Sequence, residues 1–348
     1  MAYRVVQWNA GNVGRRAIIA IQRNPNLELV GCYVRDSDKA GKDAGTLAGI
    51  EPIDVVASQN ADALLALKPD CVSYNGLWAN ADDFCAILER GINIVTTSAF
   101  ITGHSLGEEA RNRILSACEK GNSSIFGSGI HPGFSSLLGL VAAGLCDKID
   151  CVSVLESVDA SGYASKETWE SCGFGAPINT PGLSDTLREG SKVFSEGVRV
   201  AGMALQIPFD DIRFDASFSA AVGDCDFGFM QIAKGCVAGV NAAWQGIYRG
   251  RPVVELKYRW KMGTKVEPDY PLHEGYVVNV QGRPNVSFTL KHSLPDDEQP
   301  SSAIEAMQSN LITTALPAIN AIPAVCRAPA GIRTYADLPL ITGAGFVG

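Results

Sequence analysis

The stretch that most constrains the fold lies at the start of the chain, where an apolar strand over residues 3–8 runs into a glycine-containing turn and an apolar helix. Gly11 and Gly14 fit the second and third places of a G-x-G-x-x-G turn, and Asn9 stands in the first. Asparagine tolerates positive φ better than most residues, so the tight turn is expected to form. Backbone N–H groups and the helix N-terminus then face an anion such as a pyrophosphate. The alternative is an ordinary strand–helix turn with glycines at its bends.

The end of the second predicted strand, over residues 27–34, bears on the choice of dinucleotide. In such units an acid at this point binds the ribose 2′-hydroxyl of NAD, whereas a nearby arginine accommodates the 2′-phosphate of NADP. Arg35 comes first here, with Ser37 and Lys39 behind it, while Asp36 is the contrary signal. We therefore expect NADP(H) in preference to NAD(H). A solvated loop of mixed charge is the alternative reading.

The rest of the first third alternates strands with helices. Strands are predicted at 55–58, 71–75, 92–97 and 123–126, and helices at 61–68, 82–90 and 108–120. This alternation predicts a parallel, doubly wound α/β sheet. Ligands of such sheets bind at the carboxyl ends of the strands. The residues expected at these ends are Tyr74, Asn75, Gly76, Thr97 and Ser98.

After residue 134 the pattern changes to that of an α+β domain with an open, mixed or antiparallel sheet. Helices are predicted at 135–146, 186–205 and 304–326, and strands at 149–157, 212–218, 226–237, 240–245, 252–260, 275–280 and 286–290. Several of the strands alternate apolar with polar residues, as in a sheet with one wet face. We predict a dinucleotide-binding domain over 1–133, a substrate-binding and dimerisation domain over 134–303, and a returning segment over 304–348.

Charge and composition exclude several classes of protein. The net charge of −8 argues against a nucleic-acid partner, which favours a basic surface. No stretch approaches the roughly 20 apolar residues that span a bilayer. The ten cysteines form no C-x-x-C pair and mostly lie in apolar runs, which is typical of buried thiols in a reducing cytoplasm. The four histidines are dispersed, so no metal site is predicted.

Several blocks of the sequence resemble a known family. They are Trp8-Asn9-Ala10-Gly11-Asn12-Val13-Gly14, Gly127-Ser128-Gly129-Ile130-His131-Pro132-Gly133-Phe134 and Ala318-Ile319-Asn320-Ala321-Ile322-Pro323, followed by blocks at 328–332 and 335–339. The chain resembles the dihydrodipicolinate-reductase-like superfamily, and within it the branch of 2,4-diaminopentanoate dehydrogenases and native amine dehydrogenases.

The resemblance implies a Rossmann-like first domain, a nicotinamide cofactor in an interdomain cleft, and dimerisation through the second domain's sheet. Carried over by position, Asn9, Gly11, Asn12 and Val13 would line the pyrophosphate. Tyr74, Asn75, Gly76, Thr97 and Ser98 would lie along the nicotinamide half. Asn320 would approach the nicotinamide or its ribose.

Two departures from the family limit the chemistry. Dihydrodipicolinate reductases carry a histidine-rich run with a downstream lysine. The corresponding residues 159–168 here contain one lysine, Lys166, and no histidine. Amine dehydrogenases of this branch place a glutamate shortly after the strand that corresponds to 92–97. Here Ser98, Ala99 and Phe100 follow that strand, and Glu108 is the nearest acid downstream. Lysine biosynthesis and that mechanism of amination are therefore disfavoured.

Hydride transfer to a carbonyl or imine needs orientation and a proton source. His131 is the leading candidate donor, because imidazole titrates near neutrality and its loop lies at a strand end; a histidine that only bonds backbone at the domain hinge is the alternative. Glu156 and Tyr163 are further catalytic candidates, each with a structural hydrogen-bonding role as its alternative. Aromatic residues at 163, 169 and 174, with Trp78 and Phe100, suggest a lid over a hydrophobic substrate, or else interface packing.

The predicted function is that of an NAD(P)H-dependent oxidoreductase that transfers hydride to a C=O or C=N bond of a small hydrophobic substrate. Two alternatives stay open. One is an amine dehydrogenase that uses another carboxylate, such as Glu108, Glu156 or Asp159. The other is a non-catalytic nucleotide-binding protein on the same fold. A cytoplasmic homodimer is expected in each case.

Overall fold

The computed structural model describes residues 2–263, 265–298, 300 and 303–347. The chain divides into two compact units, which are described separately. Unit 1 holds Met1–Phe134 and Leu311–Gly348, and unit 2 holds Ser135–Asn310. The sequence predicts domain boundaries after residues 133 and 303, and the two units divide after Phe134 and Asn310. The second boundary differs because helix α10 (Ala303–Val325) begins in unit 2 and ends in unit 1.

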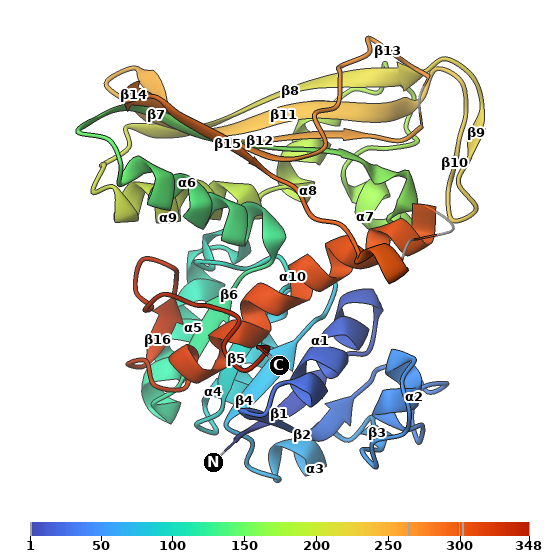
Figure 1. Ribbon diagram of the computed structural model, residues 1–348, viewed down its shortest axis with the longest axis vertical. Helices are drawn as coiled ribbons and strands as arrows, with labels where there is room; N and C mark the ends of the chain where they lie inside the picture. Colours follow the sequence, from blue (N-terminus) through green and yellow to red (C-terminus); the bar gives the residue numbers. More distant parts are fainter. Residues whose placement is uncertain (1, 264, 299, 301–302, 348) are drawn as a thin grey trace. The chain divides into compact units, whose positions relative to one another are not determined.

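Unit 1 contains a parallel sheet with the strand order β16-β6-β5-β4-β1-β2-β3 (Figure 1). Its strands are β1 (Tyr3–Trp8), β2 (Leu27–Tyr33), β3 (Ala57–Ser58), β4 (Cys71–Tyr74), β5 (Asn93–Thr96), β6 (Ser124–Gly127) and β16 (Gly331–Arg333). All six neighbouring pairs are parallel. This confirms the predicted doubly wound sheet. The C-terminal segment supplies β16 at one edge.

The helices of unit 1 bury apolar residues in the cores beside the sheet. They are α1 (Asn12–Arg23), α2 (Ala44–Ala48), α3 (Ala61–Leu65), α4 (Ala81–Leu88) and α5 (Glu108–Gly121), with short turns η1 (His104–Leu106) and η2 (Ile130–Phe134). Helix α2 packs against α1. In α1, Ala17, Ile18 and Ile21 recur at helical spacing and are wholly buried. Ile319 and Ile322 of α10 lie in the same core. Helix α3 and strand β3 are shorter than the predicted 61–68 and 55–58.

Unit 2 is built on a mixed sheet with the order β13-β8-β11-β12-β7-β14-β15. Its strands are β7 (Lys148–Asp159), β8 (Asp211–Ala221), β11 (Val237–Tyr248), β12 (Arg251–Lys261), β13 (Val266–Glu267), β14 (Gly275–Arg283) and β15 (Val286–Leu290). Only the β7–β12 pair among these is parallel. The predicted open, mixed sheet is therefore confirmed.

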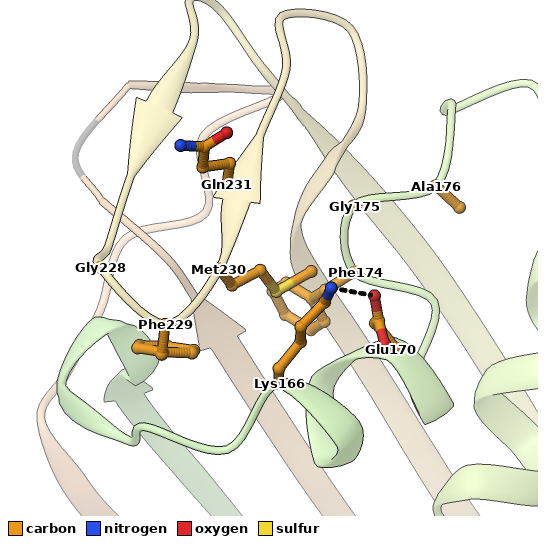
Figure 2. A pocket seen from close by; sticks show the side chains of 9 residues that line it. All are labelled: Lys166, Glu170, Phe174, Gly175, Ala176, Gly228, Phe229, Met230 and Gln231. Carbon is orange, nitrogen blue, oxygen red and sulfur yellow. Dashed lines mark ion pairs between the residues drawn. The ribbon is translucent and has the colours of Figure 1, made fainter.

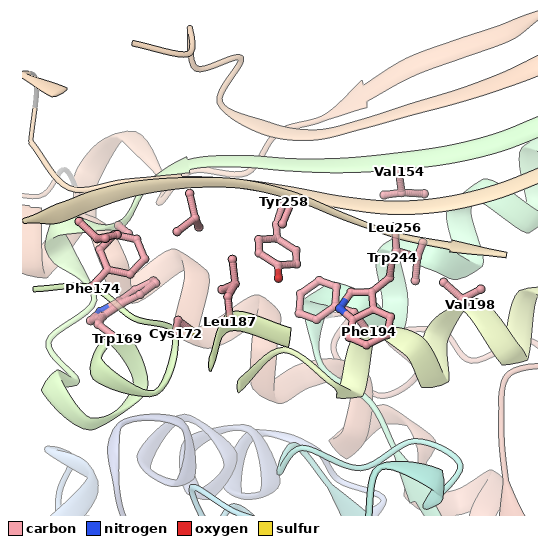
Figure 3. Packing of buried hydrophobic residues seen from close by; sticks show 14 of the residues in the cluster. Val154, Trp169, Cys172, Phe174, Leu187, Phe194, Val198, Trp244, Leu256 and Tyr258 are labelled. Atoms are coloured by element: carbon pink, nitrogen blue, oxygen red, sulfur yellow. The ribbon is translucent and has the colours of Figure 1, made fainter. Parts of the chain in front are cut away.

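One face of this sheet, here called the inner face, is covered by helices of the same unit (Figure 1). The helices of unit 2 are α6 (Ser135–Ala143), α7 (Lys166–Ser171), α8 (Leu183–Gly190) and α9 (Val193–Ala204), with short turns η3 (Ala160–Gly162) and η4 (Asp296–Glu298). Figure 3 shows Trp244 and Tyr258 pointing from the sheet towards Leu187 and Phe194 of α8 and α9. The inner face is an aromatic-rich core.

The opposite face, here called the outer face, carries a different set of side chains. Strand register places Val277, Leu155, Lys257, Ala243 and Asp215 in one row across it. The neighbouring row contains Asn279, Ser153, Glu255, Gln245 and Arg213. The apolar face is thus covered within the chain, so the need for cover gives no reason for a dimer. Any dimer through this sheet would use the mainly polar outer face.

Two predicted elements of unit 2 are wrong in detail. The helix predicted over 186–205 is two helices, because α8 ends at Gly190, where an added Cβ would collide with the carbonyl oxygen of Ser171. The strand predicted over 226–237 is a two-stranded hairpin of β9 (Cys225–Asp226) and β10 (Gln231–Ile232), followed by the start of β11. Among the helices that the structure describes, none is long and apolar enough to span a bilayer.

Candidate functional site

The carboxyl ends of β1, β4 and β5 are joined by a ladder of side-chain hydrogen bonds. Gln7 Nε2 donates to Asn75 Oδ1 over 2.8 Å, and Asn75 Nδ2 donates to Thr97 Oγ1 over 2.7 Å. Ser73 Oγ also donates to Asn75 Oδ1 over 3.0 Å. Each of these strands is parallel to its neighbour, so their ends meet at one edge of the sheet. The predicted residues Asn75 and Thr97 are therefore brought together.

The turn after β1 has the conformation that an anion site requires. Asn9 adopts a φ of 72°, as expected for the first position of the turn. Gly14 is needed for close packing, because an added Cβ would collide with the Asn9 carbonyl oxygen. At Gly11, in contrast, an added Cβ meets no described atom within 4 Å. The backbone at Gly11 is thus open to a ligand.

The N-terminus of α1 continues this open surface. Gly11 is its cap residue and provides no side-chain hydrogen bond, and the first turn contains no acid. The first N–H groups of an α-helix have no acceptor within the helix. Those of Asn12 and Val13 stand beside the open Gly11, where the helix dipole favours negative charge. A pyrophosphate fits this arrangement.

The next end of the sheet bears Ser98 and Gly76. Ser98 Oγ donates to the Gly76 carbonyl oxygen over 2.6 Å, and the Ser98 N–H donates to Thr96 Oγ1 over 3.0 Å. The Phe100 N–H donates to the Ser98 carbonyl oxygen, which closes a tight turn. The turn directs Phe100 into the core, where its ring packs edge-on against Phe84 at 5.4 Å. Phe100 is fully buried, so the expectation that it lines a substrate site is wrong.

Three side chains meet at the end of β2 and the start of α4. Arg35 Nη2 lies 3.2 Å from Asp83 Oδ2, and the Tyr74 hydroxyl donates to the same oxygen over 2.8 Å. Burial and the hydrogen bond to Asp83 raise the pKa of the Tyr74 hydroxyl well above its usual value, so Tyr74 stays protonated and remains the donor. Lys39 Nζ lies 4.0 Å from Asp36 Oδ2, and Ser37 is exposed. Both predicted cations thus have an acidic partner.

The loop after β6 holds the predicted proton donor. His131 lies in the turn Ile130–Phe134 and is partly buried. Next to it, Ser128 Oγ lies 2.7 Å from the hydroxyl of Tyr335, which comes from the C-terminal segment of unit 1. The Tyr335 ring packs edge-on against Phe126 at 5.1 Å, and burial raises the pKa of its hydroxyl. The loop after β6 is therefore held in place by Tyr335 of the C-terminal segment.

Asn320 lies on α10 between two buried core residues, Ile319 and Ala321. Its Oδ1 atom is buried and has no hydrogen-bond partner among the described residues. Gln7 Oε1, in the ladder at the ends of the strands, is buried and unsatisfied in the same way. A buried acceptor without a donor is costly, so such atoms commonly mark the place of a ligand. Both atoms belong to unit 1.

Glu156 lies on the inner face of unit 2, in a row with Tyr258 and Tyr276. Its carboxylate accepts hydrogen bonds from Trp260 Nε1 over 2.7 Å and from the Tyr276 hydroxyl over 2.9 Å. Burial raises the pKa of this carboxyl, and the two hydrogen bonds oppose the rise. No described lysine, arginine or histidine pairs with it. The carboxylate is therefore fixed in place without a neutralising cation.

The aromatic stretch expected to form a lid is folded into unit 2. Trp169 and Phe174 are buried in its core, and Trp169 Nε1 donates to the Tyr163 carbonyl oxygen over 2.8 Å. Tyr163 packs edge-on against Trp169 at 5.7 Å, and burial raises the pKa of its hydroxyl. Trp169 and Phe174 thus pack in the core of unit 2, whereas the two predicted alternatives are a lid and packing at the domain interface. Trp78 of unit 1 is 46% exposed and stays available to a ligand.

Unit 2 also contains a cavity of about 650 Å³ between α7 and the β9–β10 hairpin. It is lined by Lys166, Glu170, Phe174, Gly175, Ala176, Gly228, Phe229, Met230 and Gln231. Figure 2 shows the ion pair between Lys166 and Glu170, 3.5 Å apart, beside Met230, whose side chain points towards Phe174. Phe174 of the expected lid lines it, but none of the predicted catalytic or cofactor-binding residues does. Among the described residues, no cluster of potential metal ligands occurs.

Sequence reasoning missed Gln7, Asp83 and Tyr335. A polar Gln7 inside the apolar strand just before the glycine turn was a usable signal. Asp83 gave none, because its partner Arg35 stands 48 positions away. Tyr335 lies 207 positions from Ser128, and nothing local marks that contact.

Comparison with known proteins gives two family models that match parts of the chain and a relative that matches its full length. A family model described as the 2,4-diaminopentanoate dehydrogenase C-terminal domain matches residues 135–345, and one described as the dihydrodipicolinate reductase N-terminus matches residues 5–98. An amine dehydrogenase of Streptomyces virginiae is 26% identical over 359 aligned residues, which cover 99% of this chain and 98% of that protein.

Solved structures show the same fold. The structure of an amine dehydrogenase from Mycobacterium smegmatis has a TM-score of 0.78 at 18% identity and covers 98% of this chain and 97% of its own. The structure of GenD2 from gentamicin A biosynthesis, in complex with NAD, has a TM-score of 0.52 at 14% identity and covers 92% of this chain and 86% of its own.

Proposed function

The chain belongs to the family defined by the 2,4-diaminopentanoate dehydrogenase C-terminal domain, and from this we propose that it transfers hydride to a C=O or C=N carbon of a small hydrophobic substrate. The predicted family and the predicted class of NAD(P)-dependent oxidoreductase are confirmed by the matches. The observation that carries the proposal is the open Gly11 turn beside the ladder Gln7–Asn75–Thr97. When bound there, a nicotinamide dinucleotide would supply the hydride.

The residues of unit 1 fit such a cofactor. Gly11, Asn12 and Val13 would hold the pyrophosphate through backbone N–H groups at the start of α1. Asn9, whose N–H donates to the Tyr33 carbonyl oxygen, would line the pyrophosphate by shaping the turn through its positive φ. Thr97 Oγ1 accepts from Asn75, so its own hydroxyl proton remains available to a ligand. Tyr74, Gly76 and Ser98 complete the edge of the sheet on this side.

Asn320 supplies a further contact in this proposal. Its buried, unsatisfied Oδ1 is an acceptor, and a carboxamide N–H of the nicotinamide is a matching donor. The side chain comes from α10, which lies in the unit-1 core with α1. The unsatisfied oxygen supports the assignment that the family resemblance suggests.

We propose NADP(H) as the preferred cofactor. Arg35, Ser37 and Lys39 cluster at the end of β2, where the 2′-phosphate of NADP stands in related folds. The Arg35 side chain is 61% exposed and can exchange its partner for a phosphate at little cost. Asp36 and Asp83 oppose this preference, so we expect it to be modest.

His131 is the proposed proton donor to the alkoxide or amide that forms as hydride arrives. Support comes from its place in the loop that follows β6, at the carboxyl end of the sheet where ligands bind. Tyr163 and Glu156 are weaker donors. Burial raises the pKa of the Tyr163 hydroxyl, and both oxygens of Glu156 already accept hydrogen bonds.

Reductive amination is the second candidate, and Glu156 is the observation that favours it. No acid stands directly after β5, where Ser98, Ala99 and Phe100 follow the strand. Glu156 is a fixed carboxylate without a cation, surrounded by Trp260 and Tyr276. A carboxylate with aromatic neighbours favours a cationic amine over a neutral group. The similarity to amine dehydrogenases points the same way.

A substrate screen tests the function and separates the candidates. A panel of hydrophobic ketones is incubated with NADPH or NADH, with and without concentrated ammonium, and both cofactor absorbance and products are followed. Alcohol as the product in both buffers supports carbonyl reduction. Amine as the main product in ammonium buffer supports the second candidate. Cofactor binding without oxidation by any carbonyl or imine would leave a non-catalytic nucleotide-binding protein.

We also propose a cytoplasmic homodimer that forms through the outer face of the unit-2 sheet. Leu155, Ala243 and Val277 place apolar groups at the middle of that face. Ten free cysteines suit a reducing compartment. Light scattering at micromolar concentration should give twice the chain mass, and Leu155→Arg should give a monomer. A wild-type monomer would contradict the proposal.

A further inference from the structure

We propose that Asp83 is a specificity-determining residue that lowers the preference for NADP(H) over NAD(H) by pairing with Arg35. The inference rests on the proposed binding of a nicotinamide dinucleotide at the α1 turn. It concerns a residue on α4, outside the turn and outside the end of β2, where this discrimination is usually made.

Asp83 is held in position more firmly than Arg35. It lies in the first turn of α4, and its backbone N–H donates to Asn80 Oδ1 over 3.1 Å. Its Oδ2 accepts from the Tyr74 hydroxyl over 2.8 Å and from Arg35 Nη2 over 3.2 Å. The Asp83 side chain is 28% exposed, whereas that of Arg35 is 61% exposed. The carboxylate is therefore the fixed partner of the pair and the guanidinium is the mobile one.

The Arg35–Asp83 pair changes the charge and the hydrogen-bonding groups that lie at the end of β2, where the ribose of the cofactor would bind. A 2′-phosphate carries close to two negative charges and requires the guanidinium for itself. Asp83 occupies one of the five N–H donors of Arg35 and adds a negative charge beside the phosphate position. A 2′-hydroxyl, in contrast, can donate to a carboxylate. Asp83 Oδ1 has no partner in the described part of the chain, so it is available for this bond.

The second cation at this point shows the same balance. Lys39 stands 4.0 Å from Asp36, on the loop that follows Arg35. With Asp38 between them on the loop, the two pairs bring three acids and two cations to the end of β2. Removing the charge of Asp83 leaves two acids and two cations, which repel a phosphate less.

The neighbouring residue on α4 provides a matched control. Asp82 pairs with Arg113 and is 80% exposed, so Asp82→Asn makes the same change of charge in the same helical turn without touching Arg35. The dissociation constants of NADPH and NADH are measured by titration calorimetry for the wild type, Asp83→Asn and Asp82→Asn, without any substrate. The readout is the ratio of the two affinities, which a general loss of structure does not shift towards NADPH.

Asp83→Asn should raise the preference for NADPH about three- to tenfold, the effect of one nearby charge at a solvated site. Asp82→Asn should leave the ratio unchanged. In an Arg35→Ala background, Asp83→Asn should shift the ratio less, because the part of its effect that passes through Arg35 is then absent. An unchanged or lowered ratio in Asp83→Asn, or an equal shift in both backgrounds, would overturn the inference. A wild type that binds neither cofactor would overturn the proposed function and this inference with it.

Discussion

The side-chain amide of Gln7 donates to Asn75 Oδ1 over 2.8 Å and thereby links the last residues of β1 to the residue that follows β4. The same nitrogen donates to the Asn9 carbonyl oxygen over 2.8 Å. One buried side chain thus holds both the turn that faces the pyrophosphate and the polar ladder on the nicotinamide side. Gln7 is fully buried, so it acts by positioning these groups.

Replacing Gln7 by leucine should destabilise unit 1. The change leaves Asn9 O and Asn75 Oδ1 without this donor, and a buried group that loses its partner costs about 1–3 kcal/mol. Urea unfolding at neutral pH measures the loss. The exposed Gln22→Leu near the end of α1 is the control and should leave the midpoint within error. Equal midpoints for Gln7→Leu and the wild type would show that the ladder is dispensable.

Gly11→Ala should weaken cofactor binding, whereas Gly14→Ala should lower the stability of the fold. At Gly11 an added methyl meets open space, so the fold should survive while cofactor affinity falls more than about tenfold, or roughly 1.4 kcal/mol. At Gly14 the methyl collides with Asn9 O, so stability should fall by about 1–3 kcal/mol. Thermal unfolding and cofactor titration of both variants check this. Undiminished cofactor affinity in Gly11→Ala would show that the pyrophosphate does not bind at this turn.

Glu156 should make stability depend on pH in a defined direction. Burial raises the pKa of its carboxyl in the folded state, so folding favours the protonated form. That contribution is fully present below the unfolded-state pKa of a glutamate and is lost as pH rises through the raised folded value. Glu156→Gln carries no such charge, so its stability relative to the wild type should improve as pH rises from about 4 towards 8.

Denaturant unfolding at several pH values measures this difference. The exposed Glu28→Gln on β2 is the control and should follow the wild type. A constant gap between Glu156→Gln and the wild type at every pH would mean that Glu156 titrates alike in the folded and unfolded chain.

What the sequence could predict was local. The strand, the glycine turn and the helix follow one another along the chain, so the positive φ of Asn9 and the open Gly11 could be expected. Phe100 could not be placed, because its burial depends on a tight turn closed by its N–H and the Ser98 carbonyl oxygen and on packing against Phe84. The helix predicted over 186–205 is divided after Gly190, where the backbone of Ser171 approaches closely, and that approach is a tertiary contact.

Most site features that the sequence could not predict depend on pairs of residues that are distant in the sequence. The Arg35–Asp83 pair turns a predicted phosphate ligand into half of an ion pair, and the pattern at the end of β2 contains no sign of it. Glu156 was a candidate from its place at the end of an apolar run. Its donors Trp260 and Tyr276 come from strands more than 100 positions away, so its environment depends on the sheet.

His131→Ala should lower turnover with the best ketone found in the screen by about 10²–10⁴-fold, the usual contribution of a positioned general acid. Cofactor affinity should change little, because the proposed cofactor contacts lie on the α1 turn, at the ends of β2, β4 and β5, and on α10. His273→Ala on an exposed segment of unit 2 is the matched control and should keep wild-type turnover. Single-turnover rates with saturating NADPH separate the chemical step from binding. If His131→Ala keeps its single-turnover rate while Glu156→Gln loses it, the proton comes from the carboxyl in unit 2 and the assignment to the imidazole is wrong.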